Sequence, residues 1–181
     1  MSTAQDTLAT WMAEEETVRA RLMPVGITPM SEVLSRTGLQ FMQDMFAGKL
    51  PPASIGRTMD FLLVEVGDGK AVFQGTPSEA HLNPMGTVHG GWFATLLDSA
   101  LGCAVHTKMP AGRAYTTTEL SVQMIKAITP KVQRLRAIGE VVHTGRQLAV
   151  AHGRLVGPDG TLYAHATTTC LVFDIPGQTK S

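Results

Sequence analysis

The sequence contains little cysteine and has no net charge, and both features exclude some classes of protein. Only Cys103 and Cys170 occur, and neither belongs to a CxxC pair. Because both lie in apolar stretches, we expect reduced, buried, structural thiols and a cytoplasmic protein. Fifteen basic side chains balance fifteen acidic ones. An even balance gives no overall field that would attract nucleic acid or an anionic membrane, so neither is an expected partner.

Long hydrophobic runs are absent too. The most apolar stretch, residues 88–105, is interrupted by Asp98 and is rich in Gly and Ala, which argues against a membrane span. The opening stretch MSTAQDTLATWMAEEE has no basic residue ahead of an apolar run, so a secretion signal is not expected. A length of 181 residues favours one domain that is large enough to bury a core.

Several catalytic and cofactor motifs are missing. Six histidines occur, but no pair has the close spacing of zinc ligands and no cysteine supports them, so we expect no metal. The GxSxG motif of serine hydrolases is absent, as are the phosphate-binding loops GxGxxG and GxxxxGK[ST]. The sequence therefore predicts an activity that needs no bound cofactor.

Hydrophobic periodicity divides the chain into a helical start and a β-rich remainder. Residues 3–22 and 30–48 have helical patterns, with Gly48 as a C-cap and Pro51-Pro52 as a stop. From Arg57 the period changes to two. The expected strands are two within residues 59–78, joined by a turn at 67–69, and then 115–128, 132–143, 147–156 and 161–173. Short turns require antiparallel neighbours, so the predicted fold class is α+β, with a curved antiparallel sheet around one long helix.

That long helix, residues 89–106, is apolar or small on nearly every side, which is typical of a buried helix. Its small and polar positions recur at steps of three and four and form one narrow stripe: Gly91, Thr95, Asp98 and Gly102. No other charged residue lies between Asn83 and His106. A buried carboxylate is costly unless it is paired or used, so Asp98 is either a polar residue at a wet helix edge or a functional group.

Gly90 and Gly91 lie where a loop enters this helix. The first turn of a helix has N–H groups without helical partners, and its dipole favours negative charge. These glycines either make a tight turn only or let a ligand approach N–H groups that would stabilise an oxyanion. Eight residues at about 1.5 Å each place Gly90 about 12 Å from Asp98, too far for one acyl carbon to contact both. A second, antiparallel copy of the helix would bring them together, which predicts a homodimer with two composite sites.

The residues of this region resemble those of a known family. The pattern N-P-x-G-x-V-H-G-G at 83–91, followed by A-x-L-L-D at 94–98, is similar to the hotdog-fold acyl-CoA thioesterases of the PaaI type. The similarity continues through GCAVHTKMPAG, TTTELSVQMIKAIT, GEVVHTGRQ and GTLYAHATTTCLV, and it covers about residues 50–174. FMQDMFAGKLPPASI also resembles a lead-in of one branch. The resemblance implies a hotdog thioesterase domain at 51–175, after an N-terminal helical extension at 1–50 and before a C-terminal tail at 176–181.

The resemblance implies a hydrolysis reaction that releases a carboxylic acid and coenzyme A. Asp98 would be the catalytic carboxylate, either as the nucleophile or as the general base for water. The backbone N–H of Gly90 would polarise the thioester carbonyl, with Gly91 beside it at the substrate. In this family the dimer pairs Asp98 of one subunit with Gly90 of the other, and many members pair dimers into tetramers.

Three more site residues follow from the resemblance. Asn83 would orient the thioester or the attacking water, and His89 would border the same loop. Thr117, on the strand after the helix, would position water, with Thr116 and Thr118 as the neighbouring alternatives.

Coenzyme A is anionic, so basic residues near strand ends would hold its phosphates. Arg146 is the first candidate, and Lys126 or Arg113 would join it; the alternative for each is an ordinary surface charge. Two other functions stay open: a hotdog module that binds acyl-CoA without hydrolysis, and a hydratase or dehydratase. Asp98 together with Asn83 argues against a pure binder, and no acid–histidine pairing supports the third function. The acyl group is either aromatic or a medium-chain fatty acyl.

Overall fold

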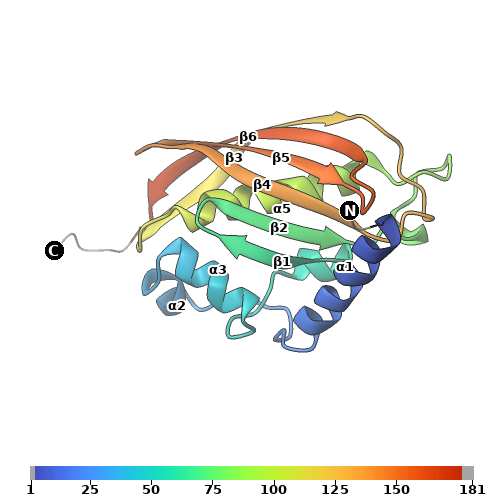
Figure 1. Ribbon diagram of the computed structural model, residues 1–181. Helices are drawn as coiled ribbons and strands as arrows, with labels where there is room; N and C mark the ends of the chain where they lie inside the picture. The colour runs from blue at the N-terminus through green and yellow to red at the C-terminus, as the bar shows by residue number, and fades with distance from the viewer. Residues whose placement is uncertain (1–2, 177–181) are drawn as a thin grey trace.

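In the computed structural model, which describes residues 3–176, a six-stranded sheet curves around the long helix α5 (Gly90–Thr107) (Figure 1). The strands are β1 (Phe61–Gly67), β2 (Lys70–Gly75), β3 (Arg113–Met124), β4 (Leu135–Thr144), β5 (Leu148–Val156) and β6 (Leu162–Asp174). Their order in the sheet is β1-β2-β4-β5-β6-β3, and every neighbouring pair is antiparallel. The predicted α+β class and the antiparallel sheet around one central helix are confirmed.

Strand β3 forms one edge of the sheet and β1 forms the other. The sequence predicted a strand as far as residue 128, but β3 ends at Met124. The N–H groups of Ile125 and Lys126 both donate to the carbonyl of Tyr163, so the alternation of the ladder stops there. Ile128 then turns into the core, where it is fully buried.

Helix α5 packs closely on the sheet because glycines face it. Leu96, Leu97 and Leu101 of α5 are fully buried. Gly139 of β4 pairs with Gly153 of β5 in the sheet register. A Cβ atom at Gly139 would lie 2.4 Å from the carbonyl oxygen of Ala100 in α5. An alanine at that position would therefore force the helix away from the sheet.

The described N-terminal residues form four helices, α1 (Ala4–Arg19), α2 (Met30–Leu34), α3 (Gly38–Phe46) and α4 (Ser54–Thr58). The single helix predicted over residues 30–48 is wrong. Thr37 starts a new helix, since its hydroxyl accepts the N–H of Gln40 while the Gln40 side chain accepts the N–H of Thr37. Gly48, the predicted cap, follows α3 with φ of +74°, the left-handed conformation of a helix end. The predicted C-terminal tail, apart from Pro176, lies outside the described residues.

Helices α1 and α3 lie near β1 (Figure 1), and their apolar residues pack on different faces of it. Val18 of α1 forms a small apolar cluster with Leu62 and Val64. Met42 of α3 lies in the main core, which also contains Phe61. Successive residues of a strand point to opposite faces, so α1 and α3 contact β1 from opposite sides. The N-terminal segment therefore shares the core of the sheet.

A buried ionic cluster fixes α1 on the sheet. Glu15 is 5% exposed, accepts a hydrogen bond of 2.8 Å from Gln74 of β2, and forms ion pairs with Arg19 and Arg134. Burial opposes ionisation of Glu15, but the hydrogen bonds from Arg19, Gln74 and Arg134 outweigh it and lower its pKa. Arg19 also pairs with Asp60 at 2.8 Å, which joins the end of α1 to the residue before β1.

Candidate active site

The loop that enters α5 is built around Asn83. The side-chain oxygen of Asn83 accepts the N–H groups of Met85 at 2.9 Å and Thr87 at 3.3 Å, and its amide nitrogen donates to the Thr87 hydroxyl at 2.8 Å. The N–H of Val88 donates to the carbonyl of Ile128, which ties the loop to the segment after β3. Both ends of the Asn83 amide are thus used to hold the loop. Its predicted contact with a thioester or with water stays a prediction.

His89 is the N-cap of α5. Its Nδ1 accepts the N–H of Gly91 at 2.9 Å, which places the proton of a neutral imidazole on Nε2. The N–H of Gly91 is therefore occupied by the hydrogen bond to His89, so a ligand at this residue would contact its Cα atom instead. Within residues 3–176 the N–H of Gly90 makes no hydrogen bond, as expected for the first residue of a helix. A Cβ at Gly90 would lie 2.7 Å from Cε of Met124, so that flexible side chain covers the helix start.

Asp98 lies in the middle of α5 and faces β3. The hydroxyl of Thr117 donates to Oδ1 of Asp98 at 3.0 Å. The strand register shifts at Thr118, whose own hydroxyl donates to a carbonyl of β6, and Thr116 is exposed. Of the three neighbouring threonines, Thr117 is therefore the one that holds the carboxylate. Within residues 3–176, Oδ2 makes no hydrogen bond, so it can meet a water molecule or a substrate.

Two further groups surround the carboxylate. The hydroxyl of Tyr115 lies against the small-residue stripe of α5, since a Cβ at Gly102 would be 2.8 Å from it. Burial, followed by the charge of Asp98, raises the pKa of Cys103 to about 12, and burial raises the pKa of Tyr115 well above its usual range. Both groups stay protonated at neutral pH, so neither is an activated nucleophile or base. Cys103 and Cys170 are both free thiols.

A cavity of about 440 Å³ opens in front of Asp98. Its wall near the carboxylate comes from α5 and β3. The lining also includes Phe61 and Leu63 of β1, Phe73 of β2, and most of the residues within 22–25 and 52–57. The volume falls in the range of small-molecule pockets, roughly 300–1,000 Å³. The cavity is therefore large enough for the acyl part of a substrate.

One chain does not bring the two halves of the predicted site together. Gly90 and Asp98 lie on the same continuous helix, eight residues apart. At about 1.5 Å per residue they are about 12 Å apart along its axis. The free N–H and the carboxylate therefore cannot contact the same carbonyl group within one protomer.

The predicted basic residues lie in different surroundings. Arg146 is exposed in the turn between β4 and β5. The guanidinium of Arg113 donates to the carbonyl of Arg146 and pairs with Asp174 at 3.2 Å. The ammonium of Lys126 lies 5.6 Å from the ring centroid of Tyr163. Arg113 and Lys126 flank opposite ends of β3, so one protomer does not gather these charges at one point.

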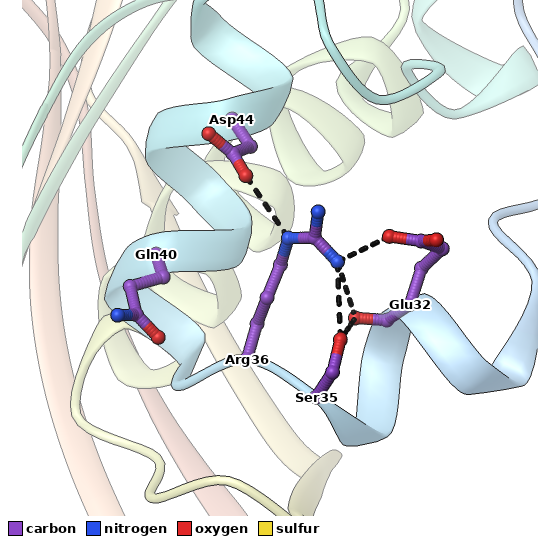
Figure 2. Close-up of a pocket in the computed structure, with 5 residues that line it drawn as sticks. All are labelled: Glu32, Ser35, Arg36, Gln40 and Asp44. Atoms are coloured by element: carbon purple, nitrogen blue, oxygen red, sulfur yellow. Dashed lines mark hydrogen bonds and ion pairs between the residues drawn. The ribbon is translucent and has the colours of Figure 1, made fainter.

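A second hollow, of about 450 Å³, lies between α2 and α3. Figure 2 shows that Arg36 is joined to Glu32, Ser35 and Asp44 by hydrogen bonds and ion pairs. Nε of Arg36 donates to Asp44 at 2.9 Å, while its terminal nitrogen pairs with Glu32 and donates to Ser35 at 3.2 Å. Gln40 also lines the hollow, but its side chain serves as part of the capping box at the start of α3. This cluster fixes α2 on α3, and it shares no residue with the cavity at Asp98.

Within residues 3–176, no three side chains of the types His, Cys, Asp and Glu are grouped so as to hold a metal ion. None of the described helices is both long and apolar enough to cross a membrane. Sequence reasoning missed Tyr115, and it did not identify which N-terminal residues border the cavity, namely those within 22–25 and 52–57. Tyr115 precedes Thr117 by two on a strand, so the period of two could have placed both on one face. The distant segments carry no such local signal.

Known proteins resemble this chain in sequence pattern and in fold. Residues 85–164 match the model of the thioesterase superfamily. No curated protein matches significantly. A putative thioesterase related to phenylacetic acid degradation, from Ralstonia eutropha, is 26% identical, covers 72% of this chain and 98% of its own, and has a TM-score of 0.66. A thioesterase family protein from Silicibacter pomeroyi is also 26% identical, with coverages of 76% and 98% and a TM-score of 0.65. A mutant of the phenylacetic acid degradation protein PaaI from Thermus thermophilus, at 24% identity, covers 65% of this chain and 96% of its own with a TM-score of 0.58, which shows the fold alone.

Proposed function

We propose that this chain, a thioester hydrolase that belongs to the hotdog-fold thioesterase superfamily through residues 85–164, cleaves acyl-coenzyme A to a carboxylic acid and free coenzyme A. The position of Asp98 carries the proposal. One carboxylate oxygen is held by Thr117, and the side chain faces a mainly apolar cavity. A carboxylate in this position is suited either to activate water or to attack the carbonyl carbon of an acyl group in the cavity.

Both chemical routes use the same carboxylate. In the general-base route, Asp98 accepts a proton from water while the water oxygen attacks the thioester carbonyl, and the coenzyme A thiolate then leaves. In the nucleophilic route, an oxygen of Asp98 attacks, the thiolate leaves, and water opens the resulting anhydride. Each route develops negative charge on the carbonyl oxygen. The partner subunit's Gly90 would stabilise that charge through its free N–H at the positive end of a helix.

The proposal includes a homodimer with two composite sites. The separation of about 12 Å between Gly90 and Asp98 supports it, because only a second, antiparallel helix would place both at one thioester. Pairing of such dimers into a tetramer is part of the same proposal. A cytoplasmic location is part of the same proposal, and two free thiols support it because thiols stay reduced in that compartment.

The remaining predicted residues would act on the two ends of the substrate. Asn83 and His89 would hold the loop that presents Gly90, because their side chains bond within that loop. Arg146 would bind a phosphate of coenzyme A, since it is exposed and its guanidinium forms no ion pair within residues 3–176. Arg113 is a weaker candidate because Asp174 already neutralises it.

The test is thiol release from aryl- and alkanoyl-CoA esters by the wild type and by Asp98→Asn. We expect turnover to fall at least about a hundredfold in the variant, within the range for the loss of a general base. Asp68→Asn is the matched control, because Asp68 is an exposed acid in the β1–β2 turn whose ion pair with Lys108 contributes little.

Two other outcomes would overturn parts of the proposal. If the wild type cleaves no ester but still binds acyl-CoA, the protein is a binding module. If Asp98→Asn and Asp68→Asn both keep wild-type turnover, the hydrolysis does not depend on Asp98.

A further inference from the structure

We infer that the N-terminal part of the chain forms the outer wall of the acyl pocket and selects unbranched alkyl chains of medium length. This inference rests on the proposed function, because it takes the acyl carbon to lie at Asp98. The wall in question, here called the N-terminal wall, consists of Met45 and of those residues within 22–25 and 52–57 that line the cavity.

The cavity is continuous from the carboxylate to this wall. Asp98 and Thr117 line it together with the aromatic rings of β1 and β2 and with the residues of the N-terminal wall. At the outer end, Met23 and Ile55 line the cavity while being 42% and 46% exposed, so they stand at its rim. A chain that starts at a thioester beside Asp98 therefore meets the N-terminal wall as it lengthens.

The wall is held in place by one buried cluster and one half-exposed ion pair. The ionic cluster of Glu15 with Gln74 and Arg134 fixes α1 on the sheet, and Arg19 joins the end of α1 to Asp60. Arg19 and Asp60 both reach the rim of the cavity, where each neutralises the other. The wall is thus a fixed boundary. The charges of Arg19 and Asp60 are paired, Arg57 is exposed, and most of the other wall residues that line the cavity are apolar.

The volume and the lining favour an alkyl chain over a single aromatic ring. A cavity of roughly 150 Å³ is enough to bind benzene, and the cavity at Asp98 is about 440 Å³. One ring would leave most of that space unfilled, whereas an extended alkyl chain would follow it from α5 to α4. Met23 and Met45 have flexible thioether side chains, which adapt to the shape of such a chain.

The N-terminal wall is tested with two substitutions of opposite size at Ile55. Ile55→Trp should fill the outer end of the cavity, and Ile55→Ala should open it. Ile27→Trp is the matched control, because Ile27 lies in the same part of the chain but is 96% exposed and does not line the cavity. Each added methylene that the pocket buries should raise kcat/KM about fourfold. The measurement is kcat/KM for a series of straight-chain acyl-CoA esters from butanoyl to hexadecanoyl, together with phenylacetyl-CoA.

In the wild type we expect kcat/KM to rise with chain length to a maximum at medium length and then to fall. Ile55→Trp should lower the ratio of decanoyl to butanoyl kcat/KM at least tenfold, Ile55→Ala should move the maximum to longer chains, and Ile27→Trp should keep the wild-type profile. Identical profiles in all four proteins, or a wild-type preference for phenylacetyl-CoA over every alkanoyl ester, would overturn the inference and leave the hydrolase standing. If the wild type cleaves none of these esters, the proposed function itself fails.

Discussion

Replacing Gly90 with proline would remove one backbone donor without breaking α5. Gly90 is the first residue of the helix, where proline is tolerated because the N–H has no helical partner. His89, the residue before it, has φ of −62° and ψ of 139°, a conformation that a following proline permits. Gly90→Ala is the control. Both variants add a Cβ that meets the flexible end of Met124, but only proline removes the N–H.

The size of the effect follows from the role of the donor. Loss of one oxyanion donor lowers kcat about 10²–10³-fold, so Gly90→Pro should lie at least a hundredfold below Gly90→Ala. A composite site adds a second expectation. In a heterodimer of one Gly90→Pro subunit with one Asp98→Asn subunit, one site carries both changes and the other carries neither. That heterodimer should have about half of the wild-type activity, although each parent homodimer is nearly inactive.

The assay is thiol release by heterodimers that carry two different affinity tags and are purified on both after co-expression. Subunits that carry both substitutions in the same chain, paired with wild-type subunits, provide the control. Each site of that pair carries one change, so it should be nearly inactive. The composite site is refuted if the Gly90→Pro and Asp98→Asn heterodimer is as inactive as its parents. The role of the N–H is refuted if proline and alanine at position 90 have equal activity.

Thr117→Val should lower kcat about tenfold, because it removes a hydrogen bond to a charged group, whereas Thr118→Val should not; equal thiol release by both would contradict this role. Glu15→Gln should lower the free energy of unfolding at pH 7 by about 1–3 kcal/mol. Since the pKa of Glu15 is lowered in the folded state, that difference should shrink below pH 4.5, as urea titrations against the exposed control Glu16→Gln would show. Burial lowers the pKa of His106 from 6.5 to about 4, so the wild type should lose stability as the pH falls through that window; His106→Leu should lose this dependence, and an unchanged pH slope would refute it.

The central helix and its acid could be predicted because their signal is local. A helix that is apolar all round must be buried, and a lone charge such as Asp98 within it needs a partner or a use. The strands were predicted from the alternation of apolar and polar residues with a period of two. Gly48 was predicted as a helix cap because the residue after a helix often adopts the left-handed conformation. The structure also identifies the hydrogen-bond partner of Asp98. Thr117, the middle one of three adjacent threonines, turns toward the carboxylate where the strand has a bulge.

Other features depend on choices that local patterns do not settle. The capping pair Thr37 and Gln40 was present in the sequence, but the apolar spacing across it looked continuous, so two helices were predicted as one. The position of β3 at the far edge could not be predicted, because either neighbouring strand in the chain could have paired with it. The sequence also identified Asn83 as a polar loop residue without showing that its amide is used inside the loop.

The packing of the N-terminal helices along β1 limits how copies of this chain can add to one another. A sheet grows by strands joining at an exposed edge, and an exposed edge at both ends permits open-ended fibres. Here α1 and α3 flank the two faces of β1 and α4 also contacts it, so a strand that joined β1 would meet these helices, whereas they do not flank β3 at the other edge. If two copies join at β3 around a two-fold axis, the β3 edges of both copies are paired and no longer accept another strand. In the proposed dimer, growth through the sheet would then stop at a closed pair, and the same helices that border the cavity would hinder a further strand at β1.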